Sequence, residues 1–205
     1  MAQALTLANI LSAARNNTLE DLMAPPPPSP PSSPSQPERE LQIFSDGSVR
    51  PWGPHAGCAI AFFSRHDGKW HCWAFALGSI KDPNIAELHG INAALVACLV
   101  RERHFDHFTI RSDCLRALSA VRSLRRSATP SNDPLKRAIL EKIRRLEELG
   151  KQVSLWYVPG HVDHYTCAGN RMADHWAGVA SRACEQFGAS WSDPFFVWEE
   201  HYEFL

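Results

Sequence analysis

Hydrophobic and polar positions alternate in short blocks that predict three consecutive strands. Residues 41–48 form the first candidate strand, in which Leu41, Ile43 and Ser45 alternate with Gln42 and Phe44. Residues 57–64 form a short, mostly apolar run, and residues 70–77 form a third candidate strand. Asp67-Gly68, between the second and third strands, is a hairpin turn signal. The pattern therefore predicts an antiparallel three-stranded meander.

The apolar spacing then changes to the three-to-four-residue period of helices. Asp82-Pro83 supplies an N-cap and a first-position proline, and the helix that follows carries a wide apolar stripe as far as residue 103. Asp133-Pro134 gives the same start signal to a helix that ends at Gly150. The remaining predicted elements are strands over 105–112 and 153–158 and helices over 114–124 and 168–187.

The predicted order of elements is β-β-β-α-β-α-α-β-α. Strands that follow a helix can join a sheet in parallel through a crossover connection. We therefore expect one α/β domain over residues 40–187, built on a five-stranded mixed sheet of three antiparallel and then two parallel strands, flanked by helices. A hydrophobic fraction of 44% and a charged fraction of 21% fit such a globular domain.

Two segments flank this domain. Residues 1–39 contain a possible short amphipathic helix over 4–15 and a Pro-rich run over 25–37. We expect that run to be an unpacked spacer, with binding to an aromatic groove of a partner as the alternative. Residues 188–205 form an aromatic and acidic tail, for which packing on the domain is the simplest expectation.

The net charge of −1 hides an uneven distribution. Residues 101–151 contain 13 Lys or Arg and 7 Asp or Glu, which makes this stretch +6 and the remainder −7. A basic middle segment can bind a polyanion such as nucleic acid. A solvated helix face is the alternative explanation.

The six cysteines and the N-terminus bear on localisation. No two cysteines form a CxxC pair, and several lie in apolar runs, where a free thiol behaves as a small hydrophobe. We therefore expect an intracellular, reducing compartment, the nucleus or cytoplasm, with an organelle left open. No apolar run reaches the roughly 18 residues of a membrane span, so no membrane partner is expected.

Four acidic residues occupy positions where they can meet at one sheet edge. Asp46 interrupts an apolar strand and is followed by Gly47, which allows a close backbone approach. Asp113 ends the fourth strand, where an N-cap for the next helix is the competing interpretation. Glu87 and Asp174 lie early in helices, and each alone would be a surface residue that favours the helix dipole. Together, the four suit a hard divalent cation such as Mg²⁺ or Mn²⁺.

Four strings in the sequence resemble the ribonuclease H type 1 family, in that family's order. They are FSDGS, AELHGINAAL, IRSDC and VPGH…GNRMAD, and the last is the most specific. The resemblance covers residues 40–187 and implies the family's fold. It also implies a monomeric endonuclease that hydrolyses the RNA strand of RNA–DNA hybrids with two Mg²⁺ or Mn²⁺ ions, leaving 5′-phosphate and 3′-hydroxyl ends.

The resemblance also implies roles for individual residues. Asp46 would contact both ions, Glu87 and Asp113 would hold one, and Asp174 would hold the other. His161 would shuttle protons or help the product leave, for which its pKa range is suitable. Asn170 would order the loop before the last helix.

The sequence departs from the family pattern in ways that concern substrate affinity. Arg171 follows Gly-Asn where the family often has Glu, and the short connection over 124–130 leaves no room for an extra basic substrate-binding helix. Phosphate contacts from other basic residues would compensate. The candidates are Arg137, Lys142, Arg144 and Arg145.

Alternative functions remain open on the sequence alone. One is a catalytically inactive domain of the same fold that binds nucleic acid or acts as a scaffold. Another is a zinc site formed by His161, His164 and Cys167, with His175 as a fourth ligand. The Pro-rich head and the aromatic tail suggest a fragment or descendant of a larger protein, such as a retroelement polyprotein.

Overall fold

The computed structural model describes residues 39–53, 55–127, 129, 131–160, 167–187 and 197–202. The predicted N-terminal helix and Pro-rich spacer lie outside these ranges. Within them, the elements follow the predicted order, with one additional strand at the end. They are β1 (Glu40–Val49), β2 (His55–Ser64), β3 (Lys69–Ser79), α2 (Pro83–Val100), β4 (His107–Ser112), α3 (Leu115–Arg126), α4 (Pro134–Glu148), β5 (Gln152–Tyr157), α5 (Ala168–Phe187) and β6 (Val197–Tyr202).

The sheet confirms the predicted mixed topology. Its strand order is β5-β4-β1-β2-β3-β6. Antiparallel pairs join β1 to β2 and β2 to β3, whereas β1–β4 and β4–β5 are parallel. β6 was not predicted as a strand: it pairs antiparallel with β3 from Trp70 opposite Tyr202 to Phe75 opposite Val197. The C-terminal tail therefore extends the five predicted strands to six.

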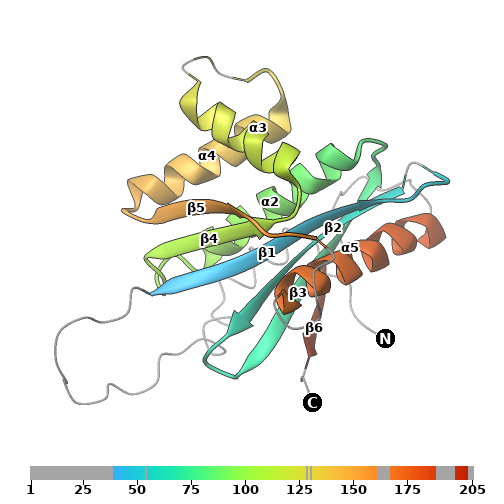
Figure 1. The fold of residues 1–205 in the computed structure, drawn as a ribbon, viewed down its shortest axis with the longest axis horizontal. Helices are drawn as coiled ribbons and strands as arrows, with labels where there is room; N and C mark the ends of the chain where they lie inside the picture. Colours follow the sequence, from blue (N-terminus) through green and yellow to red (C-terminus); the bar gives the residue numbers. More distant parts are fainter. Residues whose placement is uncertain are drawn as a thin grey trace.

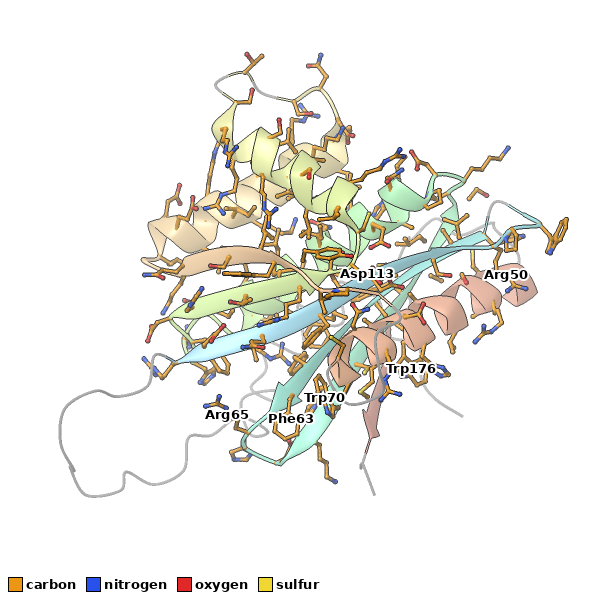
Figure 2. The ribbon with its side chains drawn as sticks, viewed as in Figure 1. Arg50, Phe63, Arg65, Trp70, Asp113 and Trp176 are labelled. Atoms are coloured by element: carbon orange, nitrogen blue, oxygen red, sulfur yellow. The ribbon has the colours of Figure 1, made fainter. Side chains whose placement is uncertain are left out.

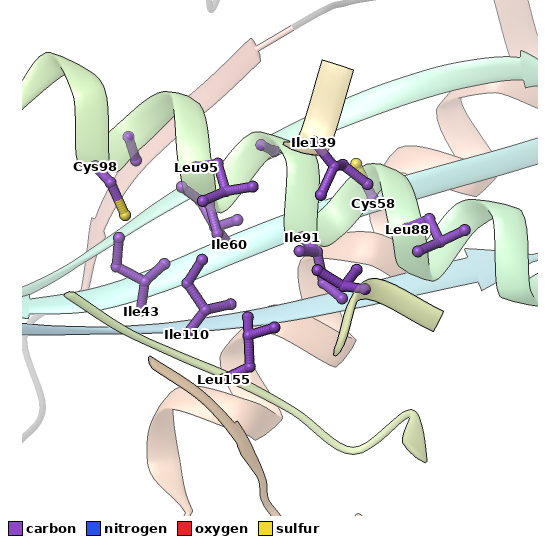
Figure 3. Close-up of a cluster of buried hydrophobic side chains, with 14 of the residues drawn as sticks. Ile43, Cys58, Ile60, Leu88, Ile91, Leu95, Cys98, Ile110, Ile139 and Leu155 are labelled. Carbon is purple, nitrogen blue, oxygen red and sulfur yellow. The ribbon is translucent and has the colours of Figure 1, made fainter. Parts of the chain in front are cut away.

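Helices cover the two faces of the sheet unequally (Figure 1). α2, α3 and α4 lie on one face, and their core with the sheet is built from large aliphatic side chains such as Ile43, Leu95 and Ile110 (Figure 3). Among the helices that the structure describes, α5 alone packs on the other face, against β1, β2 and β3. The core beneath α5 includes the small residues Ala59 and Ala61, so this helix lies close to the strands.

The predicted helix boundaries have the expected capping contacts. The Asp82 carboxylate accepts a hydrogen bond from the Asn84 N–H at 2.9 Å, and Asp133 accepts from the Leu135 N–H at 2.9 Å. Gly150 adopts φ 74° after α4, and the N–H groups of Gly150 and Lys151 return to the carbonyls of Glu147 and Leu146. This is a Schellman motif, in which glycine takes the left-handed position.

α2 is long and apolar enough to cross a membrane by length and composition, contrary to the expectation that no segment would be. Half of its 18-residue apolar window is buried inside the fold, where it forms much of the main core. Core helices of this kind satisfy the same length and composition criteria as membrane spans.

All six cysteines are free thiols, in agreement with the absence of paired motifs.

Candidate active site

Three of the four predicted carboxylates meet at the carboxyl ends of β1 and β4. These strands are parallel neighbours, so Asp46 near the end of β1 and Asp113 just after β4 lie at the same edge of the sheet. Glu87 reaches them from the first turns of α2. One carboxylate oxygen from each of the three residues lies within 4.8 Å of the other two. Figure 2 shows Asp113 near the middle of the molecule, above α5.

Two glycines bring α2 against β1 at this point. A Cβ atom on Gly47 would overlap the backbone of Ala86 and Glu87. A Cβ atom on Gly90 would lie 2.9 Å from the backbone oxygen of Asp46. Only residues without a side chain allow this approach, which places Glu87 beside Asp46. Gly90 was not identified from the sequence, although a glycine inside an apolar helix is a recognised signal of close packing.

The Asp113 carboxylate is available to the site because another residue caps α3. The N-cap is Cys114, whose Sγ accepts from the Ala117 N–H at 3.5 Å, so the N-cap interpretation of Asp113 is wrong. Asp113 instead accepts a hydrogen bond from the Asn170 side-chain amide at 3.2 Å. Asn170 is 4% exposed at the start of α5. This contact ties α5 to the end of β4.

Asp174 lies one helical turn after Asn170 on α5 and is exposed to solvent. It is outside the group of three oxygens, but its negative charge is close enough to raise the pKa of Asp46. The site therefore has a compact group of three acids and a fourth acid beside it. His161 and His164 lie outside the described residues, so the predicted loop histidine and the alternative zinc site stay predictions.

Burial and nearby negative charges make Asp46 and Glu87 hard to ionise. Burial first, and then the charges of Asp113 and Asp174, raise the pKa of Asp46 to about 8. Burial, followed by the charges of Asp46 and Asp113, raises the pKa of Glu87 to about 9. Asp46 and Glu87 also hydrogen-bond to each other, and each accepts from the Gly47 N–H. Carboxylates perturbed in this way are typical of functional sites.

The group fits a hard divalent cation. All its donor atoms are carboxylate oxygens, the type that Mg²⁺ and Mn²⁺ prefer. The Oε2 atom of Glu87 is buried and has no hydrogen-bond partner, which is costly unless a cation lies beside it. Asp46, Glu87 and Asp113 could therefore bind a metal ion.

We expect the metal-free protein to lose stability as pH rises from about 4 to 9. Asp46 and Glu87 have higher pKa values in the folded state than in the unfolded chain, so the folded state holds more protons across this range. Replacing Glu87 with Gln should flatten the decline, which thermal unfolding in the presence of a chelator would measure. The matched control is Glu141→Gln at an exposed site on α4. Equal slopes in both variants would contradict this account.

The four predicted basic residues do not lie with the carboxylates. One groove beside α4 is lined by Arg137, Lys142, Arg144 and Arg145. Leu99, near the end of α2, lines the same groove. Leu99 is twelve residues after Glu87, or about 18 Å along the helix. The Lys142 ammonium is half-buried and donates to the Ala138 carbonyl at 3.2 Å, and Arg145 pairs with Glu148 at 3.4 Å. Their role in substrate binding stays a prediction.

Comparisons with solved structures find the same fold in several RNase H proteins. RNase H1 from the archaeon Halobacterium salinarum NRC-1 has a TM-score of 0.51 and 23% identity, covering 70% of this chain and 98% of that one. The N-terminal RNase H domain of rv2228c from Mycobacterium tuberculosis has a TM-score of 0.54 and 20% identity, covering 73% and 99%. LC11-RNase H1, isolated from compost by a metagenomic approach, has a TM-score of 0.53 and 16% identity, covering 72% and 99%.

Sequence comparison identifies the family. A search of curated proteins finds no significant match. The profile of the RNase H family, however, matches residues 38–182. That span includes all five predicted strands and the four acids identified from the sequence. The chain is therefore a member of the RNase H family, whose activity is hydrolysis of RNA in RNA–DNA hybrids.

Proposed function

We propose that this ribonuclease H cuts the RNA strand of RNA–DNA hybrids internally by a two-metal-ion mechanism, leaving 5′-phosphate and 3′-hydroxyl ends. The observation that carries the proposal is the group of three buried or half-buried carboxylates, with Asp174 beside it on α5. A single cation would need only the three central acids. The fourth acid, close enough to interact with Asp46, favours a second binding position.

Each acid has a distinct part in this proposal. Asp46 interacts with each of Glu87, Asp113 and Asp174 and would contact both ions. Glu87 and Asp113 would hold one ion, and Asp174 would hold the other. The chemistry that two bound ions supply is activation of the attacking water and stabilisation of the leaving oxygen. The protein supplies fixed positions for those ions, because the contact between Gly47 and α2 holds Asp46 and Glu87 together.

Two further residues would support the reaction. Asn170 is a positioning residue, because its amide donates to the Asp113 carboxylate and fixes that oxygen relative to α5. His161 would transfer protons or assist product release, roles that histidine side chains commonly have near neutral pH. Selectivity for RNA would depend on the 2′-hydroxyl group, which distinguishes the two strands of the hybrid.

The test is cleavage of an end-labelled RNA–DNA hybrid by the full chain with Mg²⁺ or Mn²⁺. We expect internal cuts in the RNA strand only, loss of activity when a chelator is added, and 3′-hydroxyl ends that a polymerase can extend. Double-stranded DNA and double-stranded RNA serve as substrate controls. Activity that persists in chelator, or products with 3′-phosphates, would contradict the proposed mechanism.

A further inference from the structure

A second groove lies at the opposite end of β1 from the carboxylates. Its volume is about 900 Å³, and it is formed by the start of β1, the β2–β3 hairpin and the connection between α2 and β4. None of the four acids or predicted basic residues lines it. Figure 2 shows three of its side chains, Phe63, Arg65 and Trp70, gathered at the hairpin.

The groove and the active site share one face of β1. Side chains two residues apart on a strand share a face, so Gln42, Phe44 and Asp46 all lie on the α5 side of the sheet. Gln42 and Phe44 line the groove, and Asp46 belongs to the carboxylate group. Gln42 is about 13 Å from Asp46 along the strand. A strand of substrate that leaves the carboxylates toward the start of β1 would approach the groove.

Aromatic rings form one wall of the groove. Trp70 lies between two phenylalanines, with its ring centroid 6.0 Å from that of Phe44 and 5.7 Å from that of Phe63. Phe63 is 43% exposed although it lies on a strand otherwise almost entirely buried. An exposed ring supported by a second ring is a surface on which an unpaired base can stack.

The charge of the groove complements a phosphate backbone. Its lining includes three arginines and two histidines but one acid, Glu40. Arg65 and His66 are exposed at the hairpin. Arg39 pairs with Asp106 at 3.2 Å, but both side chains are more than half exposed, and such surface pairs contribute little. A phosphate could therefore replace Asp106 as the partner of Arg39.

We propose that this groove binds a single-stranded continuation of the hybrid substrate, with bases stacked on Phe63 and phosphates held by Arg65. The inference rests on the proposed function, because it uses the carboxylates as the point where the hybrid is held. Single-stranded nucleic acid is favoured over a duplex because an aromatic ring stacks on the face of an unpaired base. Bases within a duplex already stack on one another and do not expose that face.

The test compares equilibrium binding of a blunt hybrid with that of hybrids carrying a single-stranded tail of about ten nucleotides on the RNA or the DNA strand. Binding is measured by fluorescence anisotropy with the full chain. A chelator is present to prevent cleavage, which keeps this readout separate from the proposed activity. We expect at least one tail to tighten binding about tenfold. Phe63→Ala and Arg65→Gln should each remove most of that gain and leave blunt-hybrid binding and cleavage unchanged.

Arg182→Gln is the matched control, since Arg182 is exposed on α5 and does not line the groove. No gain from any tail would overturn the proposal, even if blunt hybrids are cleaved. It would also be overturned if Phe63→Ala changed the unfolding temperature while the tail effect persisted, because the groove would then serve the fold of the chain itself. Failure to cleave blunt hybrids would count against the proposed function alone.

Discussion

Replacing Asp46 with Asn is expected to lower cleavage of RNA–DNA hybrids by about 10³-fold or more. The amide has the same shape as the carboxylate, but it lacks the negative charge with which Asp46 would bind the metal ions. Asp46 is 6% exposed and central to the group, so no neighbouring side chain can take its place. The rate of hybrid cleavage in Mg²⁺, measured under single-turnover conditions, is the direct readout.

Stability distinguishes a chemical effect of Asp46→Asn from a folding defect. Burial and nearby charges raise the pKa of Asp46 to about 8, so at neutral pH the folded, metal-free protein must take up a proton at this carboxyl. Asn needs no such proton, and the variant should therefore unfold at a higher temperature. Glu141→Gln should change neither property. An Asp46→Asn variant that keeps a substantial part of its cleavage rate would remove Asp46 from the catalytic group.

Gly47→Ala is expected to destabilise the protein by about 2–4 kcal/mol and to abolish most activity. The added methyl group would overlap the backbone of α2 at Ala86 and Glu87, which no rotamer change can relieve. For a chain of this size, the loss corresponds to a fall in unfolding temperature of about 5–15 °C. Activity should fall as well, because α2 must move away and take Glu87 from Asp46.

Gly178→Ala provides the control for Gly47→Ala. Gly178 also lies in a packed element, α5, but the nearest atom to an added Cβ is the end of the Arg182 side chain at 3.6 Å. Alanine is the better helix former, so this variant should be neutral or slightly stabilised. If both alanine variants behave alike, the close contact between Gly47 and α2 is not what positions Glu87.

The fold could be predicted largely from local signals. Apolar periodicity and turn residues located five strands and four helices, and helix starts at Asp82 and Asp133 were correct because a side-chain cap is a local interaction. β6 was missed for the opposite reason. Residues 197–202 mix aromatic and acidic side chains, and their extended conformation accompanies pairing with β3, more than 120 residues earlier.

The site was only partly predictable. The positions of the acids at one sheet edge and the family resemblance both identified them, but Asp113 taken alone favoured a helix cap. The start of α3 one residue later decided between the two roles. Arg144 and Arg145 were selected because they lie in a segment rich in positive charge. The number of charges in a segment does not show how far they lie from Glu87 in the fold. The groove at Phe63 had no signal, because its lining residues come from separate parts of the chain that only the sheet brings together.

The position of β6 affects where the domain can be shortened. The family match ends at residue 182, before the end of α5 and before β6 begins. A fragment ending there would leave the backbone of β3 from Trp70 to Phe75 without its outer neighbour. An unpaired strand edge is a template for association with other chains. Such a fragment would keep all four acids and the start of α5, yet it would be prone to aggregate through β3.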